Sequence, residues 1–292
     1  MNFRVRQVAV YTYASSVPVA LHALRLMPLA SDEQQLLRSE ILIEPTPDER
    51  IEMTDFFGNS VTRIAILRPH NSLRVESRAD IRVVGRPPVG PETTPSCAQV
   101  RAQAAGSQRM DARSPVHYLF ASPLVPLDPL IRTYAAESLR DDRPILEGAL
   151  DLAVRIKAEF AFDSGATDVH TPLEEAFAKR SGVCQDFAQI MISGLRGLGL
   201  PAAYVSGYIK TNPPPGSPRL EGTDATHAWV AVWCGEAVGW RGLDPTNGIP
   251  VGGDHIEVAI GRDYADVAPV DGVIIASGAQ SLAVAVDVIP LD

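Results

Sequence analysis

Residues 180–205 read RSGVCQDFAQIMISGLRGLGLPAAYV, and the spacing of the apolar residues changes within this stretch. From Val183 to Leu198 they recur on one face of a helix, with a cysteine in the first turn. Beyond Pro201 the period becomes two, which is typical of a β-strand. Helices followed by strands predict an α+β fold, in which helices pack on one side of an antiparallel sheet.

The same two patterns continue on either side of this stretch. Helical spacing begins at about residue 129, and a second helical segment precedes residue 160. Strands are expected downstream at residues 202–210, 225–234, 238–243 and 255–260, with a C-terminal pair within 273–289. We therefore predict that residues 129–292 form one α+β core.

The first part of the chain has a different character. Residues 2–84 follow a period of two, most clearly over 73–83, where apolar or small residues alternate with charged ones. Turn-forming residues at 57–60 lie between two such runs and predict a β-hairpin. This spacing predicts an antiparallel β-sandwich over residues 1–86. The proline-rich residues 87–128 are expected to be a connector with room for a helical turn at 98–105.

Composition excludes several classes of protein. The chain has 292 residues, of which 46% are hydrophobic, enough to build a core and too many for a disordered chain. Its net charge of −9 argues against a nucleic-acid or anionic-membrane binder. No apolar run approaches the roughly 18 residues of a membrane helix, and no secretion signal is recognised. Three scattered cysteines make no disulfide framework, so a cytoplasmic protein is expected.

Three residues carry the chemistry that the sequence predicts. Cys184 lies in the first turn of a helix, where the partial positive charge favours a thiolate and free N–H groups can hold an oxyanion. His227 lies early in a strand and can take the thiol proton. Asp244 ends the next strand and can orient the imidazole. If the two strands form a hairpin, His227 and Asp244 lie toward the same end of the sheet.

Each of these residues also has a structural interpretation when it is taken alone. A cysteine is usually a small buried side chain, which is what we expect of Cys97 and Cys234. A histidine before an apolar strand is often structural, and an aspartate before proline usually forms a turn. Together, and in this order, the three favour a cysteine nucleophile. Asp254 and His255 add no metal-ligand spacing, so neither a metal nor a cofactor is expected.

The sequence around these three residues resembles the transglutaminase-like superfamily of papain-type folds. The matching segments are 182–188, 199–202, 207–208, 224–230, 239–240 and 243–248. The first 84 residues also resemble the β-rich N-terminal region that often precedes this core in bacteria. That second match rests on residues 17–19, 24–26, 55–59, Pro28 and His70.

The resemblance implies acyl transfer at a peptide-type amide through a Cys184 thioester. His227 is then the general base and acid, and Asp244 orients it. Water as the acceptor gives a peptidase or amidase, whereas an amine gives a transglutaminase. The substrate is expected to be a protein or peptide. Two rival functions stay open: a non-catalytic binding module with a vestigial triad, and a metal-dependent hydrolase.

The chain departs from the family pattern at the oxyanion site. No tryptophan precedes the nucleophile, no glutamine lies at 176–183, and no calcium-site acidic cluster is recognised, which favours hydrolysis over cross-linking. The backbone N–H of Cys184 is one expected oxyanion donor, and Gln185 and Tyr208 are candidates for the second. Trp229 is expected either in the core or in the wall of the substrate cleft. The proline-rich stretch 211–218 predicts a stiff loop that overhangs the cleft.

Overall fold

The computed structural model describes residues 1–168, 171–210 and 225–291. The strands are β1 (Asn2–Val17), β2 (Val19–Leu24), β3 (Gln34–Glu44), β4 (Glu49–Thr54), β5 (Ser60–Ile66), β6 (His70–Val83), β7 (Ala161–Phe162), β8 (Ser181–Gly182), β9 (Ala202–Ile209), β10 (Ala225–Trp233), β11 (Trp240–Asp244), β12 (Ile249–Pro250), β13 (His255–Gly261), β14 (Val270–Ile275) and β15 (Gln280–Leu291). The α-helices are α1 (Cys97–Ala105), α2 (Pro129–Ala136), α3 (Ile145–Glu159), α4 (Leu173–Lys179), α5 (Cys184–Gly197) and α6 (Tyr264–Val267). Two short 3₁₀ helices, η1 (Pro91–Thr93) and η2 (Pro115–Tyr118), lie between β6 and α2.

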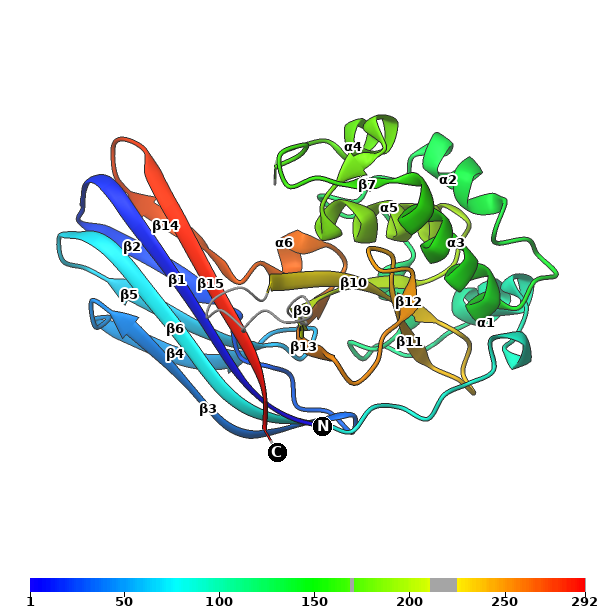
Figure 1. Ribbon diagram of the computed structural model, residues 1–292, viewed down its shortest axis with the longest axis horizontal. Coiled ribbons are helices and arrows are strands. Elements are labelled where there is room, and N and C mark those ends of the chain that lie inside the picture. The colour runs from blue at the N-terminus through cyan, green and yellow to red at the C-terminus, as the bar shows by residue number, and fades with distance from the viewer. Residues whose placement is uncertain (169–170, 211–224, 292) are drawn as a thin grey trace, which may run out of the picture.

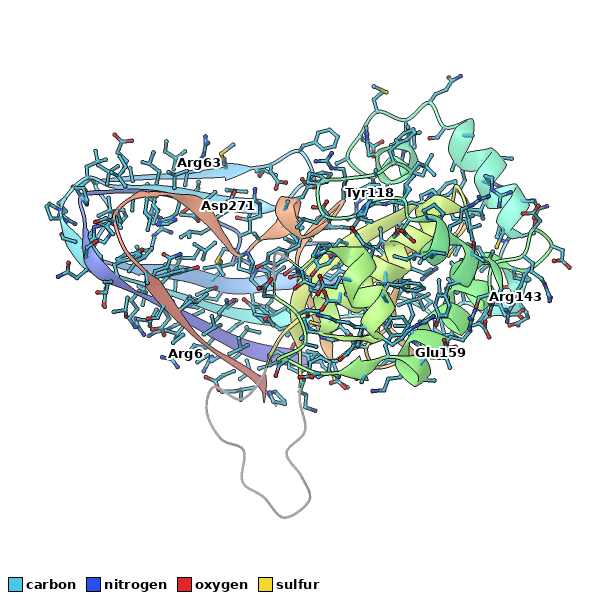
Figure 2. The ribbon with its side chains drawn as sticks, turned by 90° about the horizontal axis from the view of Figure 1, so that it is seen from above. Arg6, Arg63, Tyr118, Arg143, Glu159 and Asp271 are labelled. Carbon is cyan, nitrogen blue, oxygen red and sulfur yellow. The ribbon has the colours of Figure 1, made fainter. Side chains whose placement is uncertain are left out.

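The chain folds into a β-sandwich and a helical core that lie beside one another (Figure 1). The sandwich consists of two four-stranded antiparallel sheets, ordered β15-β1-β6-β3 and β14-β2-β5-β4. Alternation along β6 buries Leu73 and Val75 against Ile64 and Ile66 of the facing sheet. Arg6 and Arg63 mark the two outer faces of the sandwich (Figure 2). The predicted N-terminal sandwich is therefore present, and its 57–60 turn joins β4 to β5.

The last two strands complete the sandwich and do not belong to the α+β core. β15 pairs antiparallel with β1 from Asn2↔Leu291 to Tyr13↔Gln280, and β14 pairs with β2. As a result the two ends of the chain lie close together (Figure 1). The expectation that residues 129–292 form one core is thus wrong for residues 270–291. A period of two predicts a strand, but it does not say which sheet that strand joins.

The α+β core has a five-stranded antiparallel sheet ordered β12-β11-β10-β9-β13, with helices α2, α3 and α5 packed together beside it. Helix α5 is central, because it contacts both α2 and the strands β9 and β10. Its Gly194 lets α2 approach closely, since a Cβ there would lie 2.6 Å from the Cβ of Ala135. Within the described residues, no helix has both the length and the apolar character needed to cross a lipid bilayer.

Much of the connector predicted at 87–128 packs against the rest of the molecule. Helix α1 begins at Cys97 and buries Cys97, Val100 and Ala104 in the helical core. Tyr118 packs between Phe57 of the sandwich and Trp240 of the core, with ring centroids 6.1 and 5.0 Å away. Proline predicts breaks in regular structure, but it does not prevent a segment from being buried.

Two amide side chains of the sandwich bind the edge strand β13 of the five-stranded sheet of the core. Gln34 accepts a hydrogen bond from the Glu257 N–H (2.9 Å) and donates one to the Glu257 carbonyl (2.8 Å). Asn59 does the same for Ile260, with both distances 2.8 Å. They therefore act as a neighbouring strand would, satisfying the backbone groups of edge strand β13. These bonds tie the sandwich to strand β13 of the core.

Candidate active site

Cys184 is the first residue of α5, and its local sequence explains that position. The Asp186 carboxylate accepts a hydrogen bond from the Val183 N–H at 2.8 Å and another from the Thr167 hydroxyl at 2.6 Å. It thereby ties down the chain entering the helix. Gly182 is required by this arrangement, because a Cβ there would lie 2.5 Å from the Asp186 Oδ2. Cys184 is partly buried, and as the first residue of α5 it lies at the N-terminus of that helix.

His227 and Asp244 are brought together by a hairpin, as the spacing predicts. Strands β10 and β11 pair antiparallel from Trp233↔Trp240 to Val230↔Leu243, which places the two residues at the same end. His227 Nε2 lies 2.8 Å from Asp244 Oδ2. Since a carboxylate only accepts hydrogen bonds, the Nε2–H donates, and Nδ1 is left for the hydrogen bond between His227 and Cys184. The three predicted residues therefore form one connected chain.

The surroundings of His227 and Asp244 favour the charged forms of both side chains. Burial opposes the imidazolium, but the hydrogen bonds to Asp244 and Cys184 outweigh it and raise the pKa of His227 to about 9. Burial also opposes the Asp244 carboxylate, yet the hydrogen bonds from His227, His255 and Asn247 hold its pKa well below the usual range. An anionic Asp244 beside a ring that readily accepts a proton is the arrangement a cysteine nucleophile needs.

Asp244 has more partners than the sequence analysis found. Its Oδ1 accepts hydrogen bonds from the backbone N–H groups of Thr246 (2.9 Å) and Asn247 (3.1 Å). Its Oδ2 accepts from His227, from the Asn247 side chain at 2.6 Å, and from His255 Nε2 at 3.2 Å. The Asp-Pro-Thr-Asn turn explains Asn247, but His255 comes from β13 and is brought there only by the tertiary fold.

His227, Asp244 and His255 also form a group whose possible ligand atoms lie within 4.8 Å of one another. Sequence spacing does not predict this group, since the residues lie on three different strands. Both histidines direct Nε2 at the same carboxylate oxygen, at hydrogen-bonding distances. The donor atoms that a metal would use are thus already engaged with one another.

The candidates for the second oxyanion donor differ in their positions. Gln185 follows Cys184 in the first turn of α5 and is partly exposed, and within the described residues its side chain forms no hydrogen bond. Tyr208 is fully buried and donates its hydroxyl to Gln7 Oε1 of the sandwich. That prediction is wrong for Tyr208, because its single hydroxyl proton is already donated to Gln7 of the sandwich. Trp229 is also fully buried, beside His227 and His255.

Two tyrosines that the sequence gives no reason to single out lie near Cys184. Tyr204 on β9 and Tyr264 on α6 both interact electrostatically with Cys184, and their ring centroids are 6.4 Å apart. Burial raises the pKa of both phenols, so they stay protonated. The sequence offers no local signal for them, since α6 follows Cys184 by 80 residues.

The other two cysteines differ from Cys184. Cys97 and Cys234 are fully buried in the helical core. Burial raises the pKa of Cys97 to about 11 and that of Cys234 to about 12, so both remain thiols at neutral pH. They have the structural character that was predicted. The predicted overhanging loop at 211–218 lies outside the described residues.

Comparison with known proteins agrees with this architecture. Residues 3–82 match the bacterial transglutaminase-like N-terminal region, and residues 132–245 match the transglutaminase-like superfamily. An uncharacterised protein of Mycobacterium tuberculosis is 38% identical over 301 residues, covering 100% of this chain and 93% of that protein. One of Mycobacterium leprae is 29% identical over 282 residues, covering 95% of each chain.

Two further matches concern proteins with named activities. A solved structure of a candidate cysteine protease from Cytophaga hutchinsonii superposes with a TM-score of 0.75, covering 100% of this chain and 92% of that one. At 20% identity this likeness shows the fold, and it confirms the α+β core preceded by a β domain. A segment of 72 residues is 42% identical to part of a protein-glutamine gamma-glutamyltransferase of Pseudomonas aeruginosa, covering 24% of this chain and 10% of that protein. From these matches, the chain belongs to the transglutaminase-like superfamily and carries the bacterial transglutaminase-like N-terminal region.

Proposed function

We propose that this protein is an enzyme that transfers acyl groups from peptide-type amides, with Cys184 as nucleophile, His227 as general base and acid, and Asp244 as orienter. One observation carries the proposal. His227 is held by Asp244 through Nε2 at 2.8 Å, which leaves Nδ1 for the thiol at the N-terminus of α5. Each group therefore has the partner that its role requires.

His227, whose pKa is raised to about 9, first takes the Cys184 thiol proton at Nδ1, and the thiolate then attacks the amide carbonyl carbon. The backbone N–H groups at the start of α5 stabilise the oxyanion that forms. The C–N bond then breaks, and the leaving amine takes the proton back from His227. The acyl group remains on Cys184 as a thioester, with Asp244 stabilising the imidazolium between the two proton transfers.

The second donor to the oxyanion is assigned to the Gln185 amide. Gln185 is next to the nucleophile, is partly exposed, and its side chain forms no hydrogen bond within the described part of the chain. The backbone N–H of Cys184 and the side-chain amide of Gln185 together resemble the pairs of donors that hold oxyanions in acyl-transfer enzymes.

Water is the acyl acceptor that we favour, which makes the protein a peptidase or amidase. His227 then removes a proton from water, and the hydroxide attacks the thioester. The C–S bond breaks to restore the Cys184 thiolate, and the carboxylic acid that leaves loses its proton to solvent. The 72-residue similarity to a protein-glutamine gamma-glutamyltransferase favours a second candidate, in which a lysine amine replaces water. Both candidates share the thioester and differ only in the second half of the reaction.

Mass spectrometry of peptide products separates these functions. Glutamine-containing peptides are incubated with the purified protein, with and without a primary amine. Cleaved or deamidated peptides indicate water as acceptor, whereas amine adducts indicate a transglutaminase. Cys184→Ala should abolish every product, and Cys234→Ala, which changes a thiol buried in the core, should retain activity.

Product formation by Cys184→Ala at the wild-type rate would exclude the thioester mechanism. Selective alkylation of Cys184 in wild type gives an independent readout that needs no substrate. If all three cysteines react at equal and ordinary rates, the non-catalytic binding module becomes the better explanation.

A further inference from the structure

His255 is a buried histidine that none of the proposed catalytic steps uses. It is the first residue of β13, and only 4% of its surface is exposed. Its Nε2 lies 3.2 Å from the Asp244 Oδ2, the same oxygen that accepts the hydrogen bond from His227. The rings of the two histidines have centroids 6.2 Å apart.

The second ring nitrogen of His255 determines its tautomer. The Gly252 N–H points at His255 Nδ1 at 3.3 Å, so Nδ1 is an acceptor and carries no proton. The proton of the neutral ring is then on Nε2, from which it is donated to Asp244. The backbone supports the same geometry, because the His255 N–H donates to the Gly252 carbonyl at 3.1 Å.

We propose that His255 is a positioning residue of the active site, which holds the Asp244 carboxylate in the orientation that His227 requires. This inference rests on the proposed function of the triad. Asp244 Oδ1 is held by the turn that follows it, through the N–H groups of Thr246 and Asn247. Oδ2 faces His227, and the hydrogen bonds that it accepts from His255 and Asn247 restrict rotation of the carboxylate.

The position of His255 in the fold gives this role a physical basis. Strand β13 is an edge of the five-stranded sheet of the core, and its outer side is bound by Gln34 and Asn59 of the sandwich. Trp229 packs edge-on against the His255 ring at 5.2 Å between centroids. His255 thus connects the docked sandwich to Asp244, and its ring has little freedom to turn.

Two conservative substitutions separate the two hydrogen bonds of His255. In His255→Asn, the amide oxygen replaces Nδ1 and keeps the bond from Gly252, but the side chain is too short to reach Asp244. In His255→Gln, the amide nitrogen replaces Nε2 and keeps the bond to Asp244, while the bond from Gly252 is lost. His22→Asn, which changes a partly buried histidine of the sandwich, is the matched control.

The measurement is the rate of Cys184 alkylation by iodoacetamide as a function of pH, followed by mass spectrometry in the full-length protein. We expect His255→Asn to lower the rate at pH 6 about ten- to hundred-fold, the effect of losing a hydrogen bond to a charged group. In the plot of alkylation rate against pH for this variant, the midpoint of the change that depends on His227 should also move to lower pH. His255→Gln should keep the wild-type midpoint and a rate within about three-fold of wild type.

Several results would overturn the inference. If His255→Asn and His255→Gln both keep the wild-type profile, His255 does not position Asp244. If both lose rate with an unchanged midpoint, the role is only structural, since partial unfolding lowers the amount of reactive protein without moving the midpoint. One equivalent of tightly bound zinc, released by either substitution, would assign His255 to a metal site instead. If His227→Ala leaves the wild-type profile unchanged, the proposed triad fails, and the inference with it.

Discussion

The Asp244 carboxylate accepts more hydrogen bonds than it would need for orienting His227 alone. Its carboxylate accepts hydrogen bonds from His227 and His255, from the Thr246 N–H, and from both the backbone and side chain of Asn247. Because it is fully buried, each lost partner leaves a polar group without water to replace it. The site should therefore be sensitive to a change of a single atom at this position.

Asp244→Asn makes that change, replacing one carboxylate oxygen by an N–H₂ group. The amide cannot accept hydrogen bonds at both positions, so His227 takes the wrong tautomer or orientation. We expect amide-bond turnover to fall about 10³- to 10⁴-fold, as measured by peptide mass spectrometry. Asp271→Asn, on β14 of the sandwich, is the control and should keep full activity. An unaffected turnover in Asp244→Asn would exclude the orienting role.

The pKa of His227 also predicts how stability depends on pH. Since folding raises this pKa from 6.5 to about 9, the stabilisation is complete below pH 6.5 and is lost as the pH rises through about 9. Urea unfolding of wild type and His227→Gln at pH 6 and pH 10 measures this. The difference in unfolding free energy should be larger at pH 6. A difference independent of pH would show that the ring is neutral when folded.

At the scale of single elements, the start of α5 depends on one acidic side chain. Asp186 accepts hydrogen bonds from the Val183 N–H and from the Thr167 hydroxyl, and a Cβ on Gly182 would lie 2.5 Å from its Oδ2. These contacts fix the turn of chain that leads directly into Cys184. Stability of the helix end and reactivity of the thiol are therefore expected to change together.

Asp186→Ala removes both hydrogen bonds, whereas Thr167→Val removes only one. We expect the first variant to lower the free energy of unfolding by about 1 to 2 kcal/mol and the second by about half as much. Urea denaturation gives both values. Alkylation of Cys184 should slow in Asp186→Ala, because the first turn of α5 frays. A larger loss of stability in Thr167→Val than in Asp186→Ala would show that the Asp186 hydrogen bonds do not stabilise the start of α5.

At the scale of the whole molecule, Asn59 joins the sandwich to the five-stranded sheet of the core. It is fully buried, and it pairs with both the N–H and the carbonyl of Ile260. Asn59→Ala would leave these two backbone groups unpaired and should lower the free energy of unfolding by about 2 to 4 kcal/mol. Asn71→Ala, at an exposed position of β6, should change it by less than about 0.5 kcal/mol. Equal effects in urea denaturation would argue against this contact.

Strand β15 is part of the sandwich through its pairing with β1, and substitutions in it test that position. Val288 is fully buried in the cluster that also contains Phe3, Tyr208 and Ile256, whereas the neighbouring Ile289 is 42% exposed. We expect Val288→Ala to cost about 2 kcal/mol of unfolding free energy and Ile289→Ala less than about 0.5 kcal/mol. Thermal unfolding compares them. The reverse order would mean that β15 is in a different register on β1.

Local pattern was sufficient for most of the individual elements. The alternation at 73–83 predicts β6, and the 57–60 turn predicts the β4–β5 hairpin. Helical spacing after Val183 predicts α5, with Cys184 in its first turn. These features depend on neighbours a few residues away, so the sequence contains what is needed to predict them.

The sequence by itself also determined that Cys184, His227 and Asp244 are of the right types and order, and that a hairpin can join the last two. The tertiary structure alone decided that His255 contacts Asp244, that Tyr208 binds Gln7, and that β14 and β15 return to the sandwich. The physical reason is the range of the interactions. Strand pairing and side-chain contacts across more than two hundred residues, such as β1 with β15, leave no periodic trace in the sequence near either partner.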